Sequence, residues 1–107
     1  MEQQRGLYRV AVEFPGYLSR GTEVTACDVV DLTEHGFRIR TSLPAAAGDE
    51  LTLEFNLRAG CPVQCVVQIS HSAPPYLGSR IVAISPEHHK QLSQFVEQLI
   101  SLNLRGF

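Results

Sequence analysis

The chain has 107 residues, a formal net charge of −2 at pH 7 and 44% hydrophobic residues. This length suits one domain around a single core, and no apolar run reaches the ~18 residues that a membrane-inserted helix needs. The negative net charge argues against a protein that binds DNA or RNA, because such proteins present a basic surface to the phosphate backbone.

The first nine residues are mostly polar, and we expect residues 1–9 to form a flexible arm ahead of a folded domain over residues 10–107. This polarity does not match a secretory signal, which favours a cytoplasmic protein. The arm contains two arginines, Arg5 and Arg9, four residues apart. Guanidinium groups bind phosphate through paired hydrogen bonds and stack on purine faces, so the arm is a candidate anion-binding segment. A solvated tail is the plainer alternative.

Residues 10–84 alternate between strand-like segments and turn signals. The clearest two-residue period places Leu51, Leu53 and Phe55 on one face of a strand. Pro15 and Gly16 predict a bend or bulge on an edge strand. Six strands are too many for one open sheet of this length and favour a small antiparallel barrel. The predicted strands cover residues 10–18, 23–32, 37–41, 51–57, 61–71 and 76–84.

The last part of the chain changes to a helical period. Ser85, Pro86 and Glu87 supply an N-cap residue, a proline at the first helical position and an acidic first turn. Arg105 followed by glycine is typical of a helix end. We therefore predict an amphipathic helix over about residues 85–105 that packs one apolar stripe on the strands. The stripe consists of Leu92, Phe95, Val96, Leu99 and Ile100.

A second polar cluster follows the strand at residues 23–32, where Asp31, Thr33 and Gly36 stand in Asp-Leu-Thr-Glu-His-Gly. A carboxylate accepts hydrogen bonds from the N–H groups on the pairing edge of guanine. Together with Arg5 and Arg9, this cluster suits an anionic guanine nucleotide better than other common ligands. A plain hairpin turn is the alternative, because Asp and Gly are favoured in turns in any case.

Other chemistry-bearing residues have plainer interpretations. Cys61 and Cys65 would lie ~13 Å apart along a strand, too far to share a zinc ion, so we predict no metal site. Three cysteines without a secretion signal indicate free thiols in a reducing compartment. Asp28 and Asp31 are expected on opposite faces of a strand, so they form no acid–base pair. We assign a solvated face to Arg38, Arg40 and Arg80, although they could also enlarge a basic surface near a ligand.

The order of these features resembles the PilZ domain, the bacterial receptor domain for cyclic di-GMP. The family is marked by Arg-x-x-x-Arg and, after the second strand, by Asp/Asn-x-Ser-x-x-Gly. Here these segments are Arg5-Gly6-Leu7-Tyr8-Arg9 and Asp31-Leu32-Thr33-Glu34-His35-Gly36. The resemblance covers nearly the whole chain and implies an all-β fold, a six-stranded antiparallel PilZ-type split β-barrel with a C-terminal α-helix.

The resemblance also implies roles for the site residues. Arg5 and Arg9 would hold the phosphates and guanines of cyclic di-GMP, while Asp31 would accept hydrogen bonds from a guanine edge. Thr33 would add a hydroxyl contact, and Gly36 would let the backbone approach the ligand. Two departures from the family pattern are Thr33 in place of serine and a histidine where a second glycine is common. That histidine would be strained if its φ were positive.

The function implied is that of a receptor rather than an enzyme, with no cofactor and no metal. Cyclic di-GMP would draw the N-terminal arm onto the barrel, and an unknown protein effector would read the altered surface. The protein would act as a monomer or homodimer in the cytoplasm, without inserting into a membrane. The main alternative is a PilZ-like protein-interaction adaptor that does not bind the nucleotide. A small barrel that binds RNA or single-stranded DNA is disfavoured by the net charge.

Overall fold

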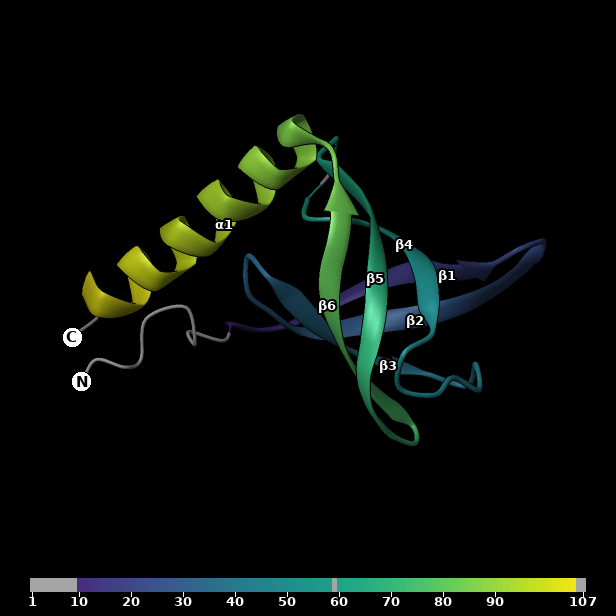
Figure 1. Ribbon diagram of the computed structural model, residues 1–107. Coiled ribbons are helices and arrows are strands. Elements are labelled where there is room, and N and C mark those ends of the chain that lie inside the picture. Colours follow the sequence, from purple (N-terminus) through teal and green to yellow (C-terminus); the bar gives the residue numbers. More distant parts are fainter. Residues whose placement is uncertain (1–9, 59, 106–107) are drawn as a thin grey trace.

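The computed structural model describes residues 10–58 and 60–105. In this part of the chain, six strands close an antiparallel barrel in the order β1-β2-β3-β6-β5-β4, and a helix follows them (Figure 1). The predicted fold class is confirmed, and strand boundaries agree with the predicted ones to within about two residues. The elements are β1 (Val10–Arg20), β2 (Glu23–Leu32), β3 (Gly36–Thr41), β4 (Glu50–Asn56), β5 (Pro62–Ala73), β6 (Tyr76–Ile84) and α1 (Pro86–Arg105).

The barrel interior is filled by the apolar residues of the alternating pattern. In β4, Leu51, Leu53 and Phe55 point inward and are buried, while the residues between them lie outside. The ring of Phe55 contacts the rings of Phe14 and Phe37, with centroids 5.9 and 5.4 Å away. Phe14 also contacts Phe95 of α1 at 5.8 Å. These rings join the barrel interior to the helix, so α1 is part of the core.

Helix α1 begins where the capping pattern predicts. The backbone N–H of His88 donates to Ser85 Oγ at 3.1 Å, which is the bond expected of an N-cap serine. His88 in turn accepts a hydrogen bond at Nδ1 from the backbone N–H of Gln64 in β5 (3.1 Å). Figure 1 shows α1 beside one end of the barrel, on the side of the turn between β2 and β3. The Ser93 hydroxyl donates to Glu34 of that turn at 3.0 Å, so the helix is tied to the turn.

Leu92→Ala is expected to lower the free energy of unfolding by about 3 kcal/mol. Leu92 is fully buried between the helix and the barrel, and its truncation leaves a cavity that the packed strands cannot fill. Urea denaturation followed by circular dichroism measures the change. Gln94→Ala on the exposed side of α1 is the control and is expected to change stability by less than about 0.5 kcal/mol. Equal effects of the two variants would show that α1 is not part of the core.

The expectation that Pro15 and Gly16 lie on an edge strand is wrong for the second half of β1. From Gly16 to Ser19, β1 pairs with β4 as well as with β2, because the barrel is closed. Pro15 lies just before this second ladder begins. A Cβ atom at Gly16 would lie 2.5 Å from the carbonyl oxygen of Glu54, so only glycine fits between the two strands.

The expectation that Asp28 and Asp31 lie on opposite faces is also wrong. A register shift in the β2–β3 ladder places one extra residue between Val29 and Asp31. Across this ladder, Asp28 faces Arg40 and Asp31 faces Arg38. Because the two arginines are two residues apart in β3, both aspartates share their outer face.

Candidate functional site

The turn between β2 and β3 is held by the threonine that the sequence singled out. Thr33 Oγ1 accepts hydrogen bonds from the backbone N–H groups of His35 (3.0 Å) and Gly36 (3.1 Å). The Thr33 N–H donates to the carbonyl oxygen of Gly36 at 3.0 Å. The hydroxyl therefore fixes the shape of the turn that carries Asp31, a role that serine could also fill.

Thr33→Val is expected to destabilise the fold by about 1 kcal/mol, because two backbone N–H groups lose their acceptor. Thr33→Ser keeps the hydroxyl and is expected to stay within about 0.5 kcal/mol of the wild type. Chemical denaturation of both variants measures the difference. If Thr33→Val were as stable as Thr33→Ser, the hydroxyl would not be what holds this turn.

Gly36 is required by strand packing rather than by a special backbone angle. A Cβ atom at this position would overlap the carbonyl oxygen of Ser79 and lie 3.1 Å from Cα of Arg80 in β6. The positive φ values in the described residues belong to Gly21, Gly48 and Gly60. His35 is therefore unstrained, and the glycine of the motif lets β3 approach β6 closely.

A groove of about 770 Å³ lies beside this turn, and the predicted site residues Asp31, Thr33 and Gly36 line part of it. The structure thus brings these three residues together at one surface. Further lining residues, which sequence reasoning did not assign to a site, include Arg38, His71, Tyr76, Gly78, Ser79 and Arg80. The sequence pattern did not indicate that these residues lie together, because β3 and β6, which pair in the barrel, are far apart in the sequence.

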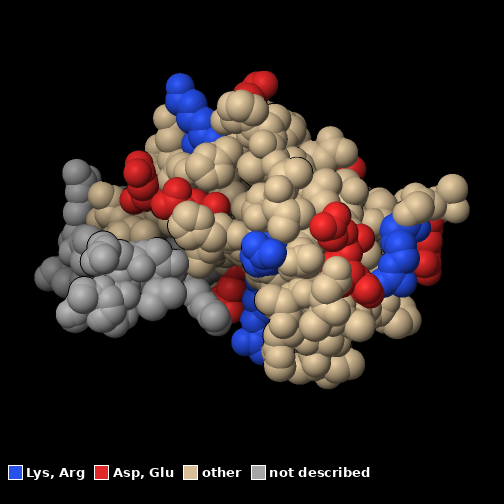
Figure 2. Space-filling model, viewed as in Figure 1, with Lys and Arg blue, Asp and Glu red and all other residues tan. Residues whose placement is uncertain are grey.

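The register of the β3–β6 ladder explains the shape and charge of the groove. Gly36 lies opposite Arg80, and Arg38 lies opposite Gly78. In each of these two cross-strand pairs a glycine faces an arginine. The space that a side chain would fill at each glycine is therefore bordered by a cation. Figure 2 shows basic and acidic side chains interspersed over the face in view rather than a continuous basic surface. An anion at this groove would therefore be held by a few local arginines.

Arg38 and Arg80, the two arginines that line the groove, each contact an uncharged side chain. Cζ of Arg38 lies 4.5 Å from the centroid of the Tyr76 ring, a cation–π contact. Arg80 donates from Nε (3.1 Å) and Nη2 (2.6 Å) to Oε1 of Gln68. Within the described part of the chain, the arginine–carboxylate pairs involve Arg20 and Arg40 instead. Neither groove arginine therefore forms an ion pair within 4.0 Å among the described residues.

Arg5 and Arg9, and with them the predicted arm over residues 1–9, lie outside the described residues. The first described residue, Val10, pairs with Leu32, and Ala11 pairs with Asp31. The chain therefore enters the barrel next to the turn that borders the groove.

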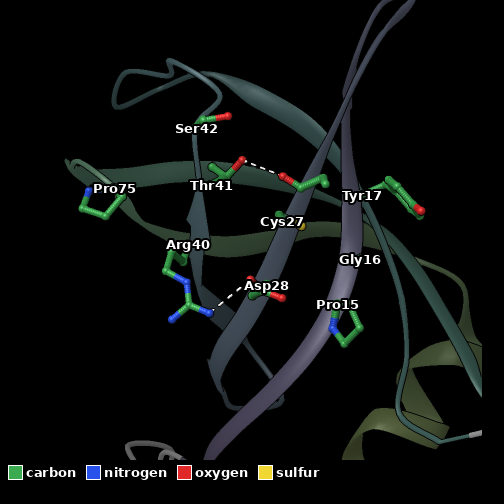
Figure 3. A pocket seen from close by; sticks show the side chains of 10 residues that line it. Pro15, Gly16, Tyr17, Cys27, Asp28, Arg40, Thr41, Ser42 and Pro75 are labelled. Carbon is green, nitrogen blue, oxygen red and sulfur yellow. Dashed lines mark hydrogen bonds and ion pairs between the residues drawn. The ribbon is translucent and has the colours of Figure 1, made fainter.

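A second hollow of about 600 Å³ lies on the outer face of β1, β2 and β3 (Figure 3). Here Arg40 donates to Asp28 at 3.1 Å and to Glu13 at 3.0 Å. Hydrogen bonds to Asp28 and then to Glu13 raise the pKa of Arg40, which stays charged. Because two carboxylates surround this guanidinium, the second hollow is poorly suited to an anionic ligand.

Cys27 lies in β2 and Cys65 in β5, as the strand interpretation predicts, whereas Cys61 lies just before β5. Burial raises the pKa values of Cys27 and Cys65 to about 12, so both thiols stay protonated at neutral pH. Cys61 precedes β5 and is half-buried, and all three thiols are free. Among the described residues, no group of three or more His, Cys, Asp or Glu side chains is arranged to hold a metal ion.

The fold and the groove define a small closed barrel with an arginine-bordered surface beside its β2–β3 turn. The family model of the PilZ domain matches residues 3–98, and the chain belongs to the PilZ domain family. A comparison with curated proteins gives no significant match. In the described residues, no helix has the length and apolar character needed to cross a membrane.

A solved structure, that of the Bacillus subtilis inhibitor of motility (MotI/DgrA), shares the fold with a TM-score of 0.79 at 12% sequence identity. The alignment covers 96% of this chain and 53% of that one, so the chain spans about half the length of the other protein.

Proposed function

We propose that this chain is a receptor for cyclic di-GMP that passes the signal to a protein partner. The proposal depends on the groove beside the β2–β3 turn, which is lined by Asp31, Arg38 and Arg80. The chain that carries this groove belongs to the PilZ domain family. This family is associated with cyclic di-GMP, and the groove offers groups that match the chemistry of that ligand.

Each part of the ligand has a counterpart at the site. Its two phosphodiester charges favour arginine, supplied by Arg5 and Arg9 and supported by the groove arginines. A guanine edge presents N–H donors, which the carboxylate of Asp31 accepts. Thr33 and Gly36 shape the turn on which this carboxylate lies. Arg9 directly precedes Val10, and Ala11 lies opposite Asp31, which supports placing the arm at this groove.

The proposed signal is a change in the position of the N-terminal arm when the ligand binds. Binding of a doubly charged ligand would draw Arg5 and Arg9 to the groove and change the surface that a protein effector meets. The size of this effect cannot exceed the difference in ligand affinity between the two arm positions. We place the protein in the cytoplasm, in accord with its free cysteines, and expect a monomer or homodimer that needs no cofactor.

Calorimetric titration of the full chain with cyclic di-GMP tests the proposal, with cyclic di-AMP as the matched ligand control. Saturable binding of cyclic di-GMP at micromolar or lower concentration, and weaker binding of cyclic di-AMP, is the expected result. Circular dichroism of the same sample shows that the protein is folded. No heat at high micromolar cyclic di-GMP would favour a PilZ-like adaptor that acts through protein contacts alone.

A further inference from the structure

Arg38 and Tyr76 form a layered pair on the outer face of the β3–β6 ladder. Cζ of Arg38 lies over the Tyr76 ring, 4.5 Å from its centroid. Tyr76 is half-buried whereas Arg38 is exposed, so the ring supports the guanidinium from the barrel side. Both residues line the groove beside the β2–β3 turn.

The position facing Arg38 across the ladder leaves this guanidinium accessible. It is occupied by Gly78, which has no side chain to cover the cation. A Cβ atom at Gly78 would lie 3.5 Å from its nearest neighbours, an ordinary contact. Barrel packing therefore does not require glycine at position 78, in contrast to position 36. The lack of a side chain at Gly78 leaves open space in the groove that Gly78 lines.

The β-bulge in β2 places an acidic residue opposite Arg38 in the β2–β3 ladder. Asp31 lies directly opposite Arg38 in the β2–β3 ladder, and the extra residue of the bulge turns Asp31 to the outer face. Side chains that face each other across antiparallel strands have Cβ atoms about 5 Å apart. A flat cationic surface and a carboxylate acceptor are thus neighbours along one border of the groove.

We infer that the Arg38–Tyr76 pair is a stacking surface for one guanine base of cyclic di-GMP, and that Asp31 accepts hydrogen bonds from the edge of that base. This inference rests on the proposed function. The planar guanidinium of arginine stacks on unpaired bases, and an aromatic ring in contact with it restricts where the guanidinium lies. Guanine presents two N–H donors on its pairing edge, whereas adenine presents an acceptor there, so the carboxylate favours guanine. Arg38 contacts the ligand, and Tyr76 is a positioning residue.

Calorimetry on the full chain tests the pair through a double-mutant cycle with Arg38→Gln and Tyr76→Leu. We expect Arg38→Gln to weaken binding of cyclic di-GMP about tenfold and Tyr76→Leu to weaken it about fivefold. The double variant is expected to bind no more weakly than Arg38→Gln alone, because Tyr76 acts through Arg38. Tyr76→Phe keeps the ring and should bind as the wild type does. Tyr17→Leu, at an exposed tyrosine outside this groove, is the control.

The outcomes separate this inference from the proposed function. Wild-type binding of cyclic di-GMP with unchanged affinity in Arg38→Gln would overturn the stacking surface and leave the receptor proposal standing. Additive losses in the double variant would overturn the layered pair. A lower thermal midpoint in Tyr76→Leu with unchanged affinity would give Tyr76 a structural role only, against the inference. Absence of binding in the wild type would overturn the proposed function and the stacking surface together.

Discussion

Arg9→Ala is expected to abolish detectable binding of cyclic di-GMP, a loss of at least about a hundredfold in affinity. An arginine that bonds to a phosphate or to a guanine edge contributes charge-assisted hydrogen bonds, each worth about 1.5–3 kcal/mol. The thermal midpoint of unfolding should change by no more than a few degrees, because the fully buried residues of the described core begin at Leu18. Calorimetric titration and a thermal melt of the same sample measure both quantities.

Arg58→Ala is the matched control for this experiment. Arg58 is exposed beyond the end of β4 and does not line the groove. Both variants remove one cation, which takes the formal net charge from −2 to −3, so a general effect of charge would appear in both. If Arg9→Ala bound cyclic di-GMP as tightly as the wild type, the proposed site would be wrong.

Gly36→Ala is expected to destabilise the protein by about 2–3 kcal/mol. The added methyl group would overlap the carbonyl oxygen of Ser79, which belongs to the backbone and cannot rotate away. Strands β3 and β6 would have to separate, and overpacking of this kind costs about 1–3 kcal/mol even where side chains adjust. Urea denaturation measures the loss, and hydrogen exchange of the β3 and β6 amides should rise more than that of β4 and β5.

Gly78→Ala provides the control in the same ladder. Its Cβ would meet the Cβ of His71 and Oγ of Ser70 at 3.5 Å, ordinary contact distances, and its φ is not in the positive range. We expect its stability to stay within about 0.5 kcal/mol of the wild type. Similar decreases in the free energy of unfolding for Gly36→Ala and Gly78→Ala would contradict the structure, in which the neighbouring strand lies closer to position 36 than to position 78.

The parts of the fold that were predicted correctly depend on neighbours in the sequence. The alternation of Leu51, Leu53 and Phe55 predicts a strand with one buried face, and the structure buries these residues. Ser85 before a proline predicts the helix start, and the cap is present. Turn chemistry acts over three or four residues, so the turn around Thr33 was also recognisable, although its hydroxyl was assigned to a ligand rather than to the turn.

The parts that failed depend on which strands become neighbours. Pro15 suggested an edge strand, but closure of the barrel gave the second half of β1 two partners. The solvated face predicted for Arg38 and Arg80 is correct, since both are exposed. The sequence did not indicate that they border one groove, because this depends on the position of β6 between β3 and β5 in the barrel. The alternation of apolar and polar residues within each strand does not indicate this strand order.

Periodicity, capping and motif spacing are properties of consecutive residues, so the strands, the capped helix, the β2–β3 turn and membership of the PilZ domain family could be inferred from the amino-acid sequence. Which side chains share the groove depends instead on how the strands pair in the folded barrel. A one-residue bulge moves Asp31 to the outer face, and the pairing of β3 with β6 sets Arg38 and Tyr76 together. Both arise from packing between segments far apart in the chain, where a shift of one residue reverses the face on which a side chain lies.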